Sequence, residues 1–240
     1  QWPLPSAKGL LVLTVGQGEI AALVGQLGSG SDSLLQSLAG LVQVSTGRLE
    51  LYGAEVVLND IRDAYDARIA YVSEDRAARG VFLEAPIGMN LVSQVLDKVS
   101  RAGWLSRGLM AERMMDLAAS FQIDAARLSH NVSTLSGGNQ QKVSLGKAAA
   151  LGPRILLLNE PTRGVDIGAR SEIYAQLRRM AERDGMTVLF YSTDLEEVLE
   201  ASDRIVTFYR GSLVRDVPRH EMTADDILHD ILHGTTKEAA

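Results

Sequence analysis

A glycine-rich run between residues 25 and 33 contains the first residues whose types and spacing could bind a charged ligand. The run reads Gly25-Gln26-Leu27-Gly28-Ser29-Gly30-Ser31-Asp32-Ser33. It follows a short apolar segment and precedes a helix-compatible one, so backbone N–H groups and a helix N-terminus would point at a bound anion. The spacing of Gly25 and Gly30 predicts a phosphate-binding loop, although a simple turn between a strand and a helix would use the same glycines.

Two positions of this loop depart from the pattern G-x-x-x-x-G-K-[ST]. Ser31 stands where a lysine would reach the β- and γ-phosphates, and Asp32 stands where a hydroxyl would ligate Mg²⁺. Losing one charge-assisted contact costs roughly 1.5–3 kcal/mol, and a carboxylate about 4 Å from phosphate adds repulsion of the order of a few kcal/mol. We therefore expect weak or absent binding of ATP and Mg²⁺ here. The residues expected to line the loop are Gly25, Gly28, Ser29, Gly30, Ser31, Asp32 and Ser33.

A second candidate lies at the end of the apolar run 155–158, where Asn159 and Glu160 follow. An aspartate at the first position would hold the Mg²⁺ shell, and asparagine cannot supply that charge. Glu160 is the candidate catalytic base that would polarise an attacking water, although the site around it is expected to be impaired. Without the other motifs, Glu160 would be interpreted as a solvated carboxylate at the end of a strand. One hypothesis is that Asp32 makes the metal contact that Asn159 cannot, so these two are the candidate metal ligands.

The elements that must position these residues alternate between apolar runs and helical patterns, which predicts a mostly parallel α/β sheet. Residues 90–128 show helical spacing without a strong strand signal and suggest a helical subdomain. Helix faces are also expected near residues 33–38 and 173–180. The strands are expected at residues 20–24, 48–52, 69–72, 155–158, 187–191, 205–208 and 213–214.

Composition restricts the function classes. The chain has 240 residues, 46% of them hydrophobic and 22% charged, which is ordinary for a soluble globular protein. A net charge of −6 argues against nucleic acid as the main partner. We find no apolar run of the roughly 18 residues that span a bilayer and no signal peptide. Cysteine is absent, which excludes thiol catalysis and disulfides. The cytoplasm is the expected location, and the start at Gln1 suggests a piece of a longer polypeptide.

Two further groups of residues are expected to be ordinary surface features. His229 and His233 are one helical turn apart, as metal ligands can be, but the segment lacks the usual glutamate and an obvious third ligand. We expect a surface helix there. Arg76 and Arg79 could bind an anion, and solvated charges are the expected reading.

Two blocks later in the chain carry a family resemblance. The first reads Leu135-Ser136-Gly137-Gly138-Asn139-Gln140-Gln141-Lys142, and the second is residues 155–169, which include Glu160-Pro161-Thr162-Arg163-Gly164-Val165-Asp166. With Tyr71-Val72-Ser73-Glu74-Asp75-Arg76, they resemble the ATPase domain of ABC transporters over residues 18–213. More narrowly, the chain is similar to the C-terminal half of the two-domain ATPases that energise bacterial uptake of ribose and other simple sugars.

The resemblance implies a P-loop NTPase of the α/β class. Its RecA-like core would have an N-terminal antiparallel β part and an inserted helical subdomain. We expect one domain over residues 1–240, in which 1–85 and 149–240 form the core and 86–148 form the subdomain that carries the signature motif.

Residue roles also follow from the resemblance. The signature residues, which cap the γ-phosphate of ATP held by the opposite ATPase domain, would be Leu135, Ser136, Gly137, Gly138 and Gln140. Coupling residues would be Glu74, where a glutamine is usual, Asp166, and Thr193, where many relatives carry a switch histidine. The aromatic residue that stacks on adenine would lie near Trp2, which could equally be an apolar end residue.

The expected function is that of an importer's nucleotide-binding half whose own site is degenerate and whose signature completes the site of a partner. Its partners would be a second ATPase domain, the membrane permease and, indirectly, a solute-binding protein, at the cytoplasmic face of the inner membrane. The alternatives are a slow stand-alone ATPase with a metal site rebuilt around Asp32 and Glu160, a non-transport ABC protein acting on nucleic acid, and a decayed relative. The transported solute cannot be read from this chain.

Overall fold

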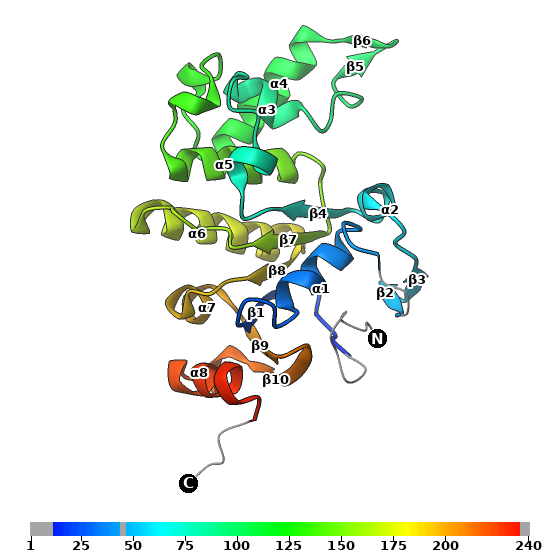
Figure 1. Ribbon diagram of the computed structural model, residues 1–240. Coiled ribbons are helices and arrows are strands. Elements are labelled where there is room, and N and C mark those ends of the chain that lie inside the picture. The colour runs from blue at the N-terminus through cyan, green and yellow to red at the C-terminus, as the bar shows by residue number, and fades with distance from the viewer. Residues whose placement is uncertain (1–11, 44–46, 236–240) are drawn as a thin grey trace. The chain divides into compact units, whose positions relative to one another are not determined.

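The computed structural model describes residues 12–43 and 47–235, and the chain divides into two compact units (Figure 1). The first unit comprises residues 1–71, 154–160 and 180–240, and the second comprises residues 72–153 and 161–179. The subdomain expected at residues 86–148 lies within the second unit. Trp2 lies outside the described residues.

A six-stranded sheet with the order β10-β9-β1-β8-β7-β4 forms the centre of the first unit. β1 pairs in parallel with β8 and β9, and β7 pairs in parallel with β8, while β10 is antiparallel to β9. The predicted α/β class and its parallel sheet are therefore confirmed. The strands are β1 (Ile20–Gly25), β4 (Ile69–Val72), β7 (Ile155–Asn159), β8 (Thr187–Tyr191), β9 (Arg204–Tyr209) and β10 (Ser212–Pro218).

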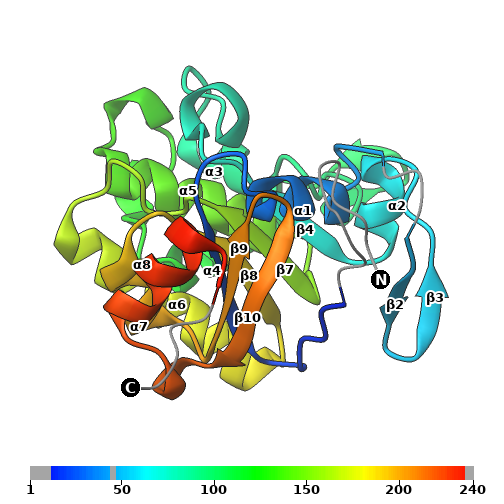
Figure 2. The same ribbon diagram turned by 60° about the horizontal axis from the view of Figure 1, so that its bottom comes forward.

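Successive strand residues point to opposite faces of this sheet. On one face, Val206 and Phe208 of β9 join the apolar cluster that also contains Leu35 of helix α1 (Ser31–Leu38). On the other, Thr207 contacts Asp230 of helix α8 (Ala224–His233). Figure 2 accordingly shows α1 on one side of β7, β8 and β9, and α8 with α7 (Leu195–Ala201) on the other.

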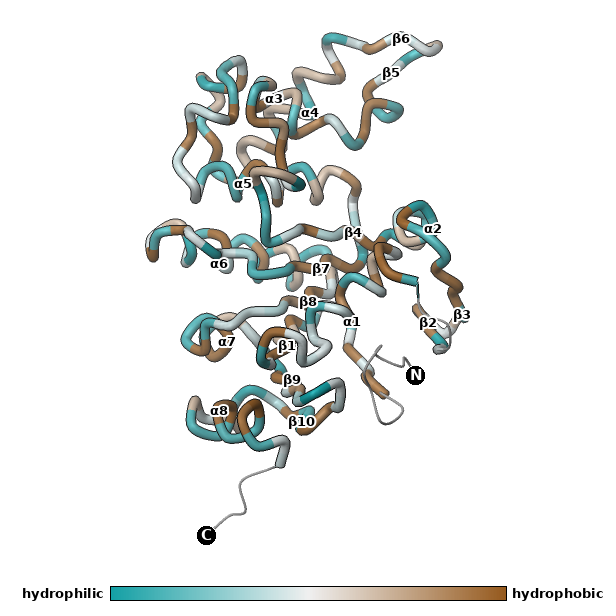
Figure 3. Tube along the Cα trace, viewed as in Figure 1, coloured by the Kyte–Doolittle hydropathy of each residue, from teal (hydrophilic) through white to brown (hydrophobic). Residues whose placement is uncertain are grey.

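The sequence explains why the central strands are buried. β1 is apolar along its whole length and β8 is apolar except for Thr187 at its start, and every residue of both is buried, as expected of parallel strands that are covered on both faces. The hydropathy colouring in Figure 3 follows the same pattern along β7 and β8. In the part of the chain that the structure describes, no helix is both long and apolar enough to cross a membrane.

A small hairpin completes the first unit. β2 (Leu49–Leu51) pairs antiparallel with β3 (Ala54–Val56), and helix α2 (Ile61–Asp66) follows. Tyr52 and Gly53 between the strands have φ of 53° and 80°, which suits a tight hairpin turn.

The second unit is mostly helical and packs α3 against α4 and α5. Its elements are the π-helix η1 (Arg76–Gly80), α3 (Ile87–Val92), β5 (Ser100–Arg101), β6 (Trp104–Leu105), α4 (Arg107–Ser120), the 3-10 turns η2 (Ala125–Arg127) and η3 (Val132–Thr134), α5 (Gly137–Ala149), and most of α6 (Ile167–Asp184). The helical pattern expected across residues 90–128 is interrupted, because β5 and β6 form a short hairpin there. Its turn residues Ala102 and Gly103 have φ of 50° and 82°.

Candidate functional site

The glycine-rich loop joins β1 to α1, as the sequence predicts, and its backbone depends on its glycines. Gly28 and Gly30 have φ of 79° and 103°, in the left-handed region that favours glycine. At Gly25, a Cβ atom would lie 2.2 Å from the hydroxyl of Ser29 and 2.8 Å from that of Ser31. Any larger residue at position 25 would therefore displace the loop.

Ser31 occupies the position expected for a lysine, and its side chain points into the loop. The residue has no exposed surface, and its hydroxyl lies 2.8 Å from the hydroxyl of Ser29, which is also buried. Two neighbours fix the loop from the side: the N–H of Gly211 donates to the carbonyl of Ser29, and the hydroxyl of Tyr191 donates to that of Gly25. Position 31 thus offers neither a cation nor an outward hydroxyl.

Asp32 lies in the first turn of α1 and is partly exposed. No side chain caps this helix: its N-cap residue is Gly30, which makes no side-chain hydrogen bond. A carboxylate near a helix N-terminus interacts favourably with the helix dipole and the unpaired N–H groups, by about 0.3–1 kcal/mol. Asp32 therefore places a negative charge where the loop would otherwise attract a phosphate.

Asn159 is the last residue of β7 and Glu160 follows it; in the sheet, β8 separates β7 from β1, the strand that leads into the loop. Asn159 is buried; its amide nitrogen lies 3.3 Å from the hydroxyl of Tyr71, and its Oδ1 has no hydrogen-bond partner among the described residues. A buried oxygen without a partner is the kind of group that a water or a hydrated ion satisfies. It is neutral, however, so it supplies no charge to a metal.

Glu160 is held in an unusual backbone conformation, with φ of 47°. Its N–H donates to the carbonyl of Tyr191, and its Oε1 accepts a hydrogen bond of 3.0 Å from the N–H of Thr193. The structure thus brings together Glu160 and Thr193, two of the predicted site residues. Thr193 contributes its backbone to this contact, so the absence of a histidine side chain there does not remove it.

The segment that presents Thr193 is fixed by two residues that the sequence analysis did not single out. The hydroxyl of Ser192 contacts the carboxylate of Glu197, and both residues are buried. The same hydroxyl accepts from the N–H of Asp194, which in turn caps α7. A Ser-x-Asp run before a helix was the available sequence signal for such a cap.

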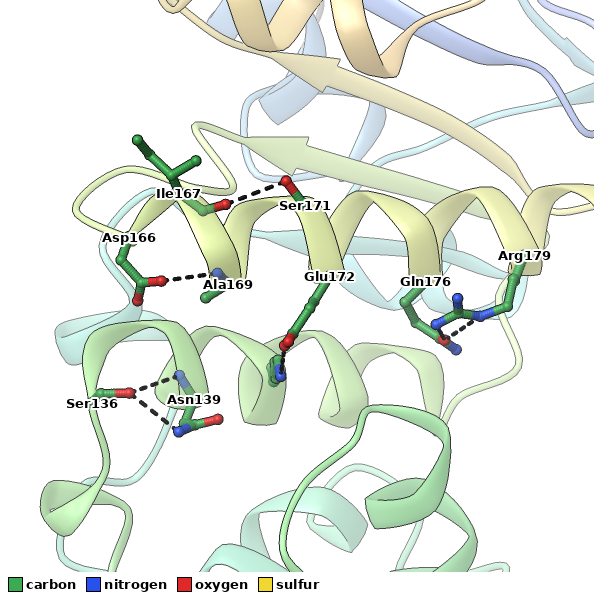
Figure 4. Close-up of polar contacts among 10 residues, drawn as sticks. Ser136, Asn139, Asp166, Ile167, Ala169, Ser171, Glu172, Gln176 and Arg179 are labelled. Carbon is green, nitrogen blue, oxygen red and sulfur yellow. Dashed lines mark hydrogen bonds and ion pairs between the residues drawn. The ribbon is translucent and has the colours of Figure 1, made fainter.

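The second unit contains the predicted signature residues at the start of α5. Ser136 is the N-cap of this helix, and its hydroxyl accepts from the side-chain amide of Asn139 at 3.2 Å, as Figure 4 shows. Gln140 turns its side chain back and donates to the carbonyl of Leu135 at 3.1 Å. A hydroxyl and free N–H groups at a helix N-terminus are suited to bind an anion.

Both signature glycines are closely packed within the second unit. A Cβ atom on Gly138 would lie 2.6 Å from the Cβ of Ala169 and 3.4 Å from Oδ2 of Asp166. One on Gly137 would lie 2.7 Å from the guanidinium of Arg76. The structure therefore places Asp166 against the signature, and the other carboxylate oxygen of Asp166 caps α6 by accepting from the N–H of Ala169 (Figure 4).

Arg76 corrects the expectation of a solvated charge. Its guanidinium donates to the carbonyl of Arg163 at 2.8 Å and lies beside Gly137 and Gly164. Arg163 in turn forms an ion pair of 3.1 Å with Glu74, a predicted coupling residue. Arg79, by contrast, is exposed as expected. The signature is thus braced by a chain of contacts from Glu74 through Arg163 and Arg76.

Lys142 of α5 is buried and contacts the carboxylate of Glu172 on α6. The ion pair joins two helices, and its two residues are 30 positions apart in the sequence. It anchors the signature helix to the segment that carries Asp166.

Sequence comparisons assign the chain to a family. The family model described as ABC transporter matches residues 10–163. The chain is 38% identical to a ribose import ATP-binding protein of Streptomyces avermitilis, over 89% of this chain and 42% of that protein. It is also 38% identical to one of Corynebacterium glutamicum, over 95% of this chain and 44% of that protein. The chain thus spans less than half the length of these relatives.

Solved structures agree on the fold. A dimeric ATP-binding cassette in a post-hydrolysis state, bound to ADP and phosphate, superposes with a TM-score of 0.73 at 23% identity, covering 86% of this chain and 88% of that chain. The cbiO1 protein of Clostridium perfringens superposes with a TM-score of 0.75 at 20% identity, covering 92% and 87%. The predicted P-loop NTPase fold is therefore confirmed, and the chain belongs to the ATP-binding family of ABC transporters.

Proposed function

We propose that this chain is the nucleotide-binding half of an importer for ribose or a related small sugar, and that it corresponds to the C-terminal half of such an ATPase. Its relatives named as ribose import ATP-binding proteins support the substrate class. As in the resemblance drawn from the sequence, its partners are a second ATPase domain and a membrane permease. The proposed working position is the cytoplasmic face of the membrane.

The chain's own phosphate loop is proposed to bind ATP weakly or not at all. The observation that carries this proposal is the buried contact between Ser31 and Ser29, because it turns the residue at the lysine position away from any ligand. Asp32 adds a negative charge at the start of α1. The backbone N–H groups of the loop could still bind a triphosphate. However, the loop offers it no cation at position 31, and the carboxylate of Asp32 would lie near its phosphates.

The signature is proposed to act on ATP bound by the partner. Ser136, Gly137 and Gly138 combine a hydroxyl with a helix N-terminus, and the packing of Asp166 and Arg76 holds that group in place. When bound at the partner, ATP and Mg²⁺ supply the phosphoryl chemistry. The role of this chain is to position the γ-phosphate.

Calorimetric titration of the chain with ATP, with and without Mg²⁺, tests the proposal at its own loop. We expect no detectable binding in either condition. Micromolar binding that requires Mg²⁺ would contradict it. Addition of a partner ATPase half with an intact lysine loop should then restore binding and hydrolysis, since the complete site needs both chains.

A slow ATPase with a rebuilt metal site is the second candidate, and one observation favours it. Asn159 presents a buried oxygen without a hydrogen-bond partner among the described residues, and Glu160 is held firmly beside it. If Asp32 supplied the missing charge, Mg²⁺-dependent binding would be lost in Asp32→Ala, and slow turnover would be lost in Glu160→Gln. Binding that survives Asp32→Ala would exclude the rebuilt site.

A further inference from the structure

We propose that His229 and His233 form a binding site for a divalent transition-metal ion such as Zn²⁺, Ni²⁺ or Cu²⁺. The proposal is independent of the nucleotide function. Both residues belong to α8 and are four positions apart, so they project from the same face of the helix. Their ring centroids are 4.8 Å apart and their planes are tilted by 48°. The two imidazoles are therefore already neighbours.

One of the two rings is held in a tautomer suited to metal binding. Nδ1 of His229 lies 2.9 Å from the backbone carbonyl oxygen of Thr235. Because a carbonyl can only accept a hydrogen bond, Nδ1 carries the proton and Nε2 keeps a free lone pair. Histidines that bind metals usually donate their second ring N–H to a carbonyl or carboxylate, which fixes the ring's orientation. The sequence alone could not reveal this contact.

The position of the Thr235 carbonyl is itself fixed by packing. Gly234 ends α8 in the left-handed conformation, with φ of 71°, and turns the chain back toward His229. A Cβ atom at position 234 would lie 2.2 Å from Cδ1 of Tyr209, so only glycine is accommodated there. The carbonyl that orients His229 is therefore part of the helix's own C-terminal structure.

The helix that carries the two histidines is firmly attached to the sheet. Asp230, between them in sequence, has no exposed surface and accepts hydrogen bonds from Thr207 and Arg215. At the other end, Thr223 and Asp226 form a capping box. A metal site needs ligands on a rigid element, and α8 supplies one.

The chemistry of the site selects the metal. Imidazole nitrogens suit Zn²⁺, Ni²⁺ and Cu²⁺, at about 2.0–2.1 Å for zinc, whereas Mg²⁺ prefers oxygen ligands. Among the described residues there is no group of three or more histidine, cysteine, aspartate or glutamate side chains that could hold a metal. Two histidines and water would therefore complete the coordination. His233 lies in the last turn of α8, where the helix dipole favours a cation.

The test is calorimetric titration of the whole chain with Zn²⁺ and, separately, Ni²⁺. We expect one ion per chain, and His229→Gln and His233→Gln should each weaken binding about tenfold or more. His220→Gln is the matched control, because that histidine belongs to the separate turn η4 (Arg219–Glu221) and its side chain is 79% exposed. It should bind as tightly as the unmodified chain. Mg²⁺ should give no signal at this site.

Nuclear magnetic resonance of the histidine rings provides a second measurement that does not depend on the variants. Saturating Zn²⁺ should shift the resonances of His229 and His233 together, while those of His130 and His220 stay in place. A shift of one ring alone, or equal zinc affinity in the double variant His229→Gln/His233→Gln, would overturn the proposal. So would a loss of affinity in His220→Gln as large as in the α8 variants.

Discussion

The hydroxyl of Ser31 lies 2.8 Å from the hydroxyl of Ser29, inside the loop that joins β1 to α1. Both side chains are buried, so the residue at the position of the phosphate-binding lysine is committed to the loop itself. The loop has a glycine-dependent backbone and carries serine, not lysine, at position 31. Substitutions that place a lysine at position 31 without changing the glycines therefore test whether the missing charge limits the loop's affinity for ATP.

Restoring the lysine and the metal-binding hydroxyl should restore nucleotide binding. In Ser31→Lys/Asp32→Ser, the added contact is worth roughly 1.5–3 kcal/mol, which is about one to two decades of affinity, and the repulsion from Asp32 disappears. Calorimetric titration with ATP and Mg²⁺ measures the change. Gln26→Lys is the matched control: Gln26 is exposed in the same loop, so the variant adds the same charge without placing it at position 31. An equal gain in affinity in both variants would mean that a positive charge anywhere in the loop strengthens ATP binding, so that a lysine at position 31 has no special role.

Removing the signature hydroxyl should impair the partner's site without affecting this chain's own. Ser136→Ala removes the N-cap hydroxyl of α5, which typically costs about 1 kcal/mol of stability. If that hydroxyl contacts the γ-phosphate, the loss is roughly 1.5–3 kcal/mol, or about tenfold or more in the partner's ATP hydrolysis. The assay uses the chain with a partner half that has an intact lysine loop.

Ser133→Ala is the control for the signature variant, because Ser133 is exposed in η3 and no hydrogen bond is described for its hydroxyl. It should leave hydrolysis unchanged. Gly138→Ala should reduce hydrolysis strongly, since its Cβ would meet Ala169 at 2.6 Å. Unchanged hydrolysis in both Ser136→Ala and Gly138→Ala would remove the signature from the proposed function.

The main strands could be predicted from the sequence because each is an apolar run bounded by polar residues or glycine. β4 and β8 were predicted with their observed bounds, and β1 and β7 were predicted to within one residue. Such strands are buried on both faces, so their composition alone marks them. The hairpin β5–β6 was missed because each of its strands has two residues, which is too short for an alternating pattern.

The residues of the candidate site were predicted from motif spacing and from the family resemblance, whereas their contacts could not be. Arg76 was misread because its partner, the carbonyl of Arg163, lies 87 residues further along the chain. Likewise, the direction of the Ser31 hydroxyl depends on the loop's folded backbone, which a list of residue types does not specify.

The buried carboxylate of Asp230 should be important for stability. It has no exposed surface and accepts from Arg215 and Thr207, so Asp230→Ala would leave a largely buried guanidinium and a buried hydroxyl without their partner. Breaking such a pair costs about 3–5 kcal/mol. Urea unfolding should show this loss, whereas Asp225→Ala, at an exposed position of the same helix, should change stability by less than about 1 kcal/mol. If Arg215→Met/Asp230→Leu were as unstable as Asp230→Ala, the unpaired charge would not be the cause.

The stability of the chain should also depend on Lys147 at alkaline pH. Burial lowers the pKa of Lys147 below its ordinary 10.5, although its ammonium donates to the carbonyl of Gly80 and lies 4.8 Å from the centre of the Phe82 ring. The charged form is therefore disfavoured in the folded state, and between the lowered pKa and 10.5 the unfolded chain binds more protons. Stability contributed by this group must rise with pH across that window and stay constant below it.

Lys147→Met removes this titration and keeps an apolar side chain of similar length. Urea unfolding from neutral pH up to 10.5, the ordinary pKa of lysine, should show the unmodified chain gaining stability relative to Lys147→Met as the pH rises. Lys98→Met, which removes an exposed lysine, controls for the loss of one surface charge. A relative loss of stability with rising pH would mean that the hydrogen bond to Gly80 and the Phe82 ring together outweigh desolvation, because a group stabilised in its charged form has a raised pKa and the opposite slope.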